Sequence, residues 1–293
     1  MLGFRKIMDC VTHFILEDLD IRGAVVHLGV SWRAMQAGRQ YSDATRALLG
    51  EMAAVTALIG SNIKTPGKVS FQVQGNGAIS LMVVDCDERL QLRGMARMSG
   101  SDGDIDAASV PTLLGDGQLT LTMQARDASQ QPYQSIVPLE GETISAIFEN
   151  YFMLSEQAPS RLWLAADGAY TCGLFLQKLP DADKKDMDGW NRAQILAATV
   201  TAAELALPAE TLLAKLFPEE NVRVFASQEA RYCCPRDEDK VIEMLRALGL
   251  DELSSIIQER GEIVIQDEIC NHEYRFGAAL IEQLFPAEAR VLH

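Results

Sequence analysis

Short apolar or alternating runs, joined by turns, dominate the first 180 residues. Residues 22–28, RGAVVHL, are predicted to form a buried strand. A helix is predicted over residues 43–61, because apolar residues recur there at helical spacing and Asp43 can cap the N-terminus. Further strands are predicted at 69–74, 79–85, 91–97, 119–123, 135–139, 161–165 and 169–177, and a second helix at 142–156. This order predicts an α+β domain with a largely antiparallel sheet for residues 1–180.

The pattern changes at residue 180, where the polar segment PDADKKDMDG breaks the apolar periodicity. Residues 189–217 then fit two short helices with narrow apolar faces. Such helices depend on docking against another surface for their stability. We therefore predict a helical linker over residues 181–230. Its apolar positions are Leu196, Val200, Leu205, Leu212, Leu213 and Leu216.

Residues 231–293 form a third, smaller unit. Amphipathic helices are predicted at 237–248 and 251–260, and each is followed by a glycine. A strand at 262–266 can pair with 274–276, and a last helix begins near Ala278. About sixty residues make a marginal core, so this α+β module is expected to need a metal, a disulfide or a neighbour.

Charge and composition exclude several classes of function. The 293 residues are 48% hydrophobic and 23% charged, which is ordinary for a soluble globular protein. The net charge of −15, most of it after residue 180, argues against binding to nucleic acid or to anionic lipid. No apolar run approaches the roughly 18 residues of a spanning helix. Asp9 and His13 interrupt the N-terminal apolar run, so we expect no signal peptide, a cytoplasmic location and reduced thiols.

Five segments carry a family resemblance: LLGE at 48–51, YFMLSEQAPS at 151–160, QKLP at 177–180, FPEENVRVF at 217–225 and CNHEYRF at 270–276. Taken in this order, they resemble the heat shock protein 33 family, the redox-regulated 33 kDa chaperonins. The resemblance runs over nearly the whole chain. It implies an N-terminal substrate-handling domain, a helical linker and a C-terminal redox switch.

The family's switch is a zinc site of four thiolates, arranged as Cys-x-Cys followed by Cys-x-x-Cys. The resemblance implies that oxidation releases the zinc, forms two disulfides and loosens the C-terminal half. The loosened protein then exposes a surface that holds unfolding clients without ATP. A homodimer in the active state is implied in the same way.

This sequence departs from that switch at two of the four cysteine positions. Cys270 matches the last cysteine of Cys-x-x-Cys, but Asp267 stands at the first. Cys234 matches the second cysteine of Cys-x-Cys, but Tyr232 stands at the first, and Cys233 fills the spacer position. Each pair has thus lost one partner, so neither disulfide of the family pattern can form.

The missing thiolates change the expected metal chemistry. A structural zinc ion takes four ligands, typically cysteine and histidine. Our prediction is that no zinc is bound. The alternative is a residual site made by Cys234, Cys270 and Asp267 and completed by His272 or Cys233.

The expected thiol chemistry also has alternatives. A Cys234–Cys270 bridge would stabilise the module on oxidation, in the sense opposite to the family switch. A vicinal Cys233–Cys234 bridge would be strained. The main expectation is that these thiols are inherited from an ancestral switch and have no present redox role. The remaining cysteines, Cys10, Cys86 and Cys172, lie among apolar neighbours and are expected to be core thiols.

The predicted function is an ATP-independent holdase with a degenerate switch, constitutive or controlled by heat, which binds unfolding proteins under stress. The client-binding candidates are the apolar linker positions named above, which would be docked at rest and exposed when active. The alternative is a binding or scaffold protein that retains the fold without chaperoning. An enzyme, such as a thiol oxidoreductase, is not expected, because Cys-x-x-Cys, Gly-x-Ser-x-Gly and His-Glu-x-x-His motifs are absent from the sequence.

Overall fold

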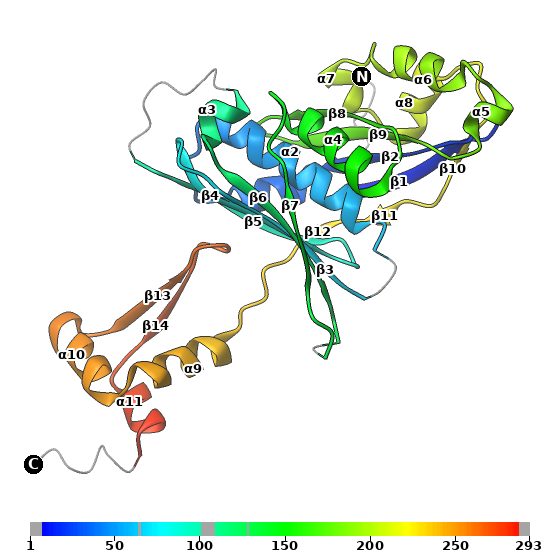
Figure 1. Cartoon of the computed structure of the whole chain (residues 1–293). Helices are drawn as coiled ribbons and strands as arrows, with labels where there is room; N and C mark the ends of the chain where they lie inside the picture. The colour runs from blue at the N-terminus through cyan, green and yellow to red at the C-terminus, as the bar shows by residue number, and fades with distance from the viewer. Residues whose placement is uncertain (1–7, 64–65, 101–108, 128, 287–293) are drawn as a thin grey trace, which may run out of the picture. The chain divides into compact units, whose positions relative to one another are not determined.

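The computed structural model describes residues 8–63, 66–100, 109–127 and 129–286. It divides the chain into two compact units, Met1–Cys233 and Cys234–His293, which are described separately below. Nearly all strand pairs are antiparallel, and helices pack against the sheets (Figure 1). The predicted α+β class is confirmed.

The first sheet of the larger unit has the order β10-β1-β2-β9-β8, and β11 also pairs with β1. Its central pair, β2 and β9, is joined in register from Ile21 opposite Lys178 to Leu28 opposite Thr171. The strands of this sheet are β1 (Cys10–Leu16), β2 (Ile21–Leu28), β8 (Ser160–Ala166), β9 (Thr171–Lys178), β10 (Val222–Val224) and β11 (Gln228–Glu229).

The second sheet has the order β12-β5-β4-β3-β6-β7. Only the short β12 runs parallel to its neighbour. The strands are β3 (Gly67–Gln74), β4 (Ile79–Asp87), β5 (Gln91–Met98), β6 (Gln118–Ala125), β7 (Tyr133–Val137) and β12 (Arg231–Tyr232), and helix α3 (Val110–Leu114) follows β5.

Helix α2 (Asp43–Gly60) lies between the two sheets and contacts strands of both (Figure 1). Gly50 allows this close packing, because a Cβ there would stand 2.5 Å from the Cβ of Ala166. The side chain that caps the helix is Ser42, which accepts from the Thr45 N–H at 3.2 Å, and not the predicted Asp43. Helices α1 (Val30–Met35) and α4 (Ile144–Glu156) add to the same core.

The linker segment covers the opposite face of the first sheet. It contains α5 (Ala182–Lys185), α6 (Gly189–Ala197), α7 (Ala202–Leu205) and α8 (Ala209–Leu216). Residues 189–217 thus form three short helices rather than the predicted two, because α7 is a separate turn with its own capping box from Thr201 and Glu204. Apolar side chains of α6, α7 and α8 form a second core with β1, β2 and β9.

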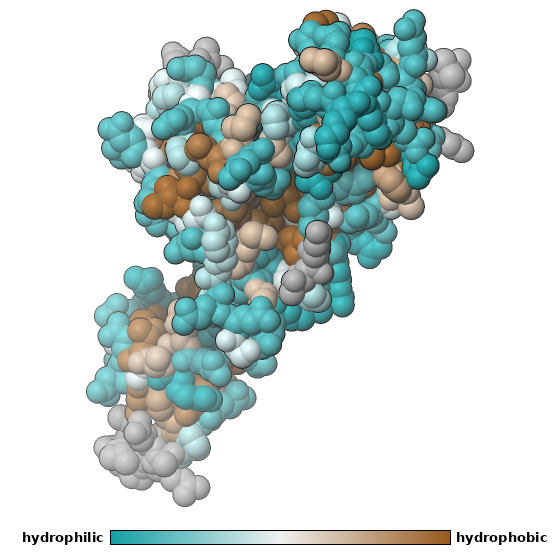
Figure 2. Space-filling model, turned by 45° about the vertical axis from the view of Figure 1, so that its right-hand side comes forward, coloured by the Kyte–Doolittle hydropathy of each residue, from teal (hydrophilic) through white to brown (hydrophobic). Residues whose placement is uncertain are grey.

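The smaller unit contains α9 (Glu238–Leu248), α10 (Leu250–Arg260), the hairpin β13 (Ile263–Asp267) and β14 (His272–Phe276), and α11 (Ala279–Leu284). Its buried apolar side chains are Leu245, Leu253, Ile263, Tyr274, Phe276 and Leu280. Hydrophobic patches are visible on its surface in Figure 2, and Met244, Leu248 and Val264 are each about half exposed. This core is small, as expected for a module of this length.

Among the helices that the structure describes, none is both long enough and apolar enough to cross a bilayer.

Candidate functional site

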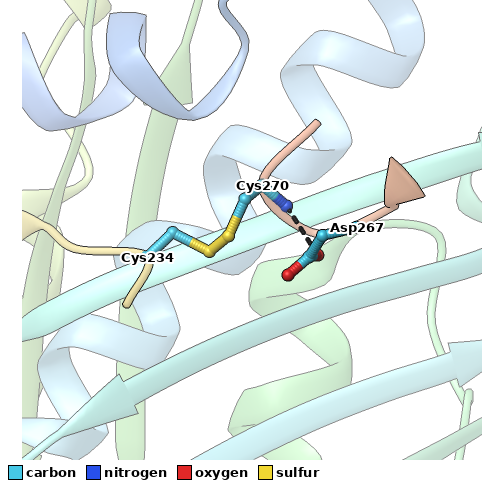
Figure 3. Close-up of side chains that lie close together, drawn as sticks. All are labelled: Cys234, Asp267 and Cys270. Atoms are coloured by element: carbon cyan, nitrogen blue, oxygen red, sulfur yellow. Dashed lines mark hydrogen bonds between the residues drawn. A yellow bond between two sulfur atoms is a disulfide. The ribbon is translucent and has the colours of Figure 1, made fainter. Parts of the chain in front are cut away.

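Two cysteines and a carboxylate meet at one point of the smaller unit (Figure 3). The ligand atoms of Cys234, Asp267 and Cys270 all lie within 4.8 Å of one another, and all three residues are partly buried. The sulfur atoms of Cys234 and Cys270 are joined as a disulfide, with 5.9 Å between the two Cα atoms. Residues 36 positions apart in sequence thus form one local site.

The turn between β13 and β14 positions Cys270. One carboxylate oxygen of Asp267 accepts hydrogen bonds from the backbone N–H groups of Ile269, at 2.9 Å, and Cys270, at 3.1 Å. Asn271 adopts a left-handed conformation with a φ of 56°, which an asparagine tolerates well. Asp267 therefore acts as the side-chain cap of a tight turn, a role that spacing alone did not suggest.

These donors do not make a complete zinc site. A structural zinc ion needs four ligands, and the cluster in the described chain offers three. The Oδ1 of Asp267 is already engaged by two backbone N–H groups. His272 and Cys233 are not members of the cluster; the ring of His272 packs edge-on against Tyr274, with centroids 4.7 Å apart. The absence of zinc stays a prediction.

Tyr232 and Cys233 belong to the larger unit. Tyr232 lies in β12 opposite Leu92 of β5 and packs against the main core. The backbone N–H of Cys233 donates to the Leu92 carbonyl at 2.9 Å, so the chain is held to the sheet up to the residue before Cys234. The thiol of Cys233 is free and partly buried.

The other cysteines are not arranged for thiol chemistry. Cys86 and Cys172 are fully buried, as predicted. Burial raises the pKa of Cys172 to about 12 and that of Cys86 higher still, so neither forms a thiolate at neutral pH. Cys10 differs from the prediction, since it is only half-buried at the start of β1, but burial raises its pKa too.

The predicted client-binding side chains of the linker are covered in this structure. Leu205, Leu212, Leu213 and Leu216 are buried against the first sheet, and Leu196 and Val200 are partly buried beside them. An ion pair between Lys215 and Glu204, at 2.6 Å, joins α8 to α7. In Figure 2 the upper right of the larger unit is mostly hydrophilic, and hydrophobic patches lie across its middle.

Sequence analysis missed one polar contact beneath the linker. His27, in β2, is buried and its Nε2–H donates to the backbone carbonyl of Leu205 at 2.8 Å. Burial lowers the pKa of His27 from its usual 6.5, although this hydrogen bond and the charge of Asp9 act in the opposite direction. The available signal was a histidine that follows the apolar residues Ala24, Val25 and Val26 within a strand.

This burial predicts that acid weakens linker docking. The pKa of His27 is lowered while the linker covers it, so the protein with a released linker binds more protons than the docked form. The contribution of His27 to docking stability is therefore complete above pH 6.5 and is lost as the pH falls below that value. The protection factors of α7 and α8, which are exchange rates corrected for the intrinsic rate at each pH, should therefore fall between pH 7 and about pH 5. His27→Gln keeps an N–H donor without titrating and should remove this dependence. His13→Gln, at another histidine whose pKa burial lowers, is the matched control and should preserve it.

Comparisons with known proteins agree along the whole chain. The family model described as "Hsp33 protein" matches residues 9–277. The chain is 38% identical to the "33 kDa chaperonin" of Methylobacillus flagellatus over 286 residues, covering 97% of this chain and 96% of that protein. A "33 kDa chaperonin" of Nitrosococcus oceani is also 38% identical and covers 96% of both chains. The crystal structure of the 33 kDa chaperonin of Thermotoga maritima shares the fold, with a TM-score of 0.77 at 19% identity, covering 97% of this chain and all of that one.

Proposed function

Because the chain belongs to the Hsp33 family, we propose that it is an ATP-independent holdase that binds unfolding proteins under stress and carries a degenerate thiol switch. The family and the names of its relatives support a chaperone function. The proposal assigns the chain no catalytic activity. It also includes a cytoplasmic location and a homodimer as the active state.

The docked linker is the observation that carries this proposal. Its helices are four to nine residues long, too short to be stable in water without the sheet beneath them. Undocking would uncover apolar side chains on both the linker and the sheet, a surface suited to partly unfolded clients. The net charge of −15 would keep that open form soluble.

The degenerate switch determines when the chaperone becomes active, and not which surface binds the client. Cys234, Asp267 and Cys270 offer an incomplete zinc site, and the small core of the second unit supplies little stability of its own. We therefore propose that heat loosens the C-terminal half, or that the chaperone is constitutively active, without the two disulfides of the family pattern.

The test uses the full chain, fully reduced and treated with a chelator, mixed with a heat-labile client enzyme in the absence of ATP. We expect it to suppress the light scattering of the aggregating client, while an unrelated acidic protein at equal concentration does not. Protection that appears only after peroxide treatment would refute the degenerate switch. No protection under any condition would favour the non-chaperone binding or scaffold protein.

A further inference from the structure

We propose that the Cys234–Cys270 disulfide is a reversible latch, which stabilises the C-terminal unit when oxidised and releases it when reduced. Two thiols and one hydrogen peroxide give one disulfide and two waters; a dithiol reductant returns both thiols by exchange and is itself oxidised to a disulfide. Oxidation would thus oppose the loosening of this unit. The latch itself is independent of the proposed function, and only its effect on client binding rests on that function.

The geometry suits a disulfide between these two residues. Their Cα atoms are 5.9 Å apart, within the range of protein disulfides. Both residues are only partly buried, as a disulfide open to reagents in solution requires. The Asp267 turn holds Cys270 through its backbone N–H, a contact that does not involve the sulfur and can persist after reduction.

The position of the bridge makes it effective. The loop between the two cysteines contains α9, α10 and β13. Three of the six buried core side chains, Leu245, Leu253 and Ile263, lie inside this loop, and Tyr274 follows it closely. Cross-linking a loop of this length restricts the unfolded chain strongly, which favours the folded unit. We expect the C-terminal unit to melt at least about 10 °C higher when oxidised than when reduced.

Cys233 is the competing partner for Cys234, but its placement disfavours it. Adjacent cysteines form an eight-membered ring that extended backbone does not accommodate, and β12 ends immediately before Cys233. The Cys233 N–H bond to the Leu92 carbonyl fixes this stretch of backbone. Cys233 therefore serves as the control thiol of the experiment.

The experiment compares the full chain after reduction with dithiothreitol and after oxidation with hydrogen peroxide. Peptide mapping without reductant should recover Cys234 linked to Cys270. Amide hydrogen exchange over residues 238–276 should be at least about tenfold slower in the oxidised protein. Cys233→Ser should keep both results, whereas Cys270→Ser should exchange like the reduced chain under either condition.

Three outcomes would overturn the latch: a Cys233–Cys234 bridge, a bridge between two chains, or faster exchange after oxidation. Amide hydrogen exchange is measured without a client protein. A failed aggregation assay would therefore refute the holdase function without contradicting the disulfide latch. If both hold, oxidised protein should protect a heat-labile client only at a higher temperature than reduced protein.

Discussion

The double substitution Tyr232→Cys and Asp267→Cys is expected to give the reduced protein a single tightly bound zinc ion. We expect the unaltered chain to bind no stoichiometric zinc. It restores the four thiolates that the family pattern calls for, and zinc in a module of this size contributes about 10–16 kcal/mol. This gain should exceed the cost of removing the Tyr232 ring from the main core and the Asp267 cap from its turn. Metal analysis of the dialysed, reduced protein and thermal unfolding with and without chelator measure the result.

Each single substitution is the matched control, because it supplies only three thiolates and should bind zinc much more weakly. Stoichiometric zinc in the unaltered chain would contradict the prediction and favour the residual site with His272 or Cys233. His272→Ala would then separate those two alternatives, since it abolishes binding only if the imidazole is a ligand.

The second large effect is expected from Leu174→Ala, a substitution in the first sheet that weakens the docking of the linker. Leu174 is fully buried in β9, in the core shared with α8, and its truncation should cost about 2–5 kcal/mol. The linker keeps its own leucines, so we expect more client protection at temperatures where the unaltered chain protects weakly. Hydrogen exchange of α8 and client light scattering measure undocking and binding separately.

Two further variants serve as controls for the Leu174→Ala experiment. Leu212→Ala should loosen α8 by a similar amount but removes part of the proposed client-binding face, so its protection should rise less. Ile195→Ala changes a side chain of α6 that is 60% exposed, and neither measurement should move. Equal protection by Leu174→Ala and the unaltered chain, despite faster exchange of α8, would show that the covered surface does not bind clients.

Periodicity predicted the long elements of this fold well, because strands such as β3 bury alternate residues and helices such as α2 carry apolar residues along their whole length. It missed β1, where the partly exposed His13 interrupts the apolar pattern. It also missed β10, β11 and β12, which are two or three residues long and exist only because β1 and β5 supply hydrogen-bonding partners. Such strands have no signature of their own in the sequence.

The candidate site was predictable to a similar degree. The family resemblance matched Cys234 and Cys270 to switch positions, and the structure brings the two residues together. It could not identify Asp267 as a turn cap, since its partners are backbone N–H groups rather than side chains. The contact between His27 and Leu205 joins residues 178 positions apart and involves a carbonyl, so no local pattern encodes it.

The short strands β10, β11 and β12 have a consequence for what the first unit would present if the linker came away. They cover the outer edge of β1 in one sheet and of β5 in the other. Their departure would leave rows of unpaired backbone N–H and C=O groups at two sheet margins. An extended polypeptide could add to either margin as a new strand, through hydrogen bonds that depend little on its sequence.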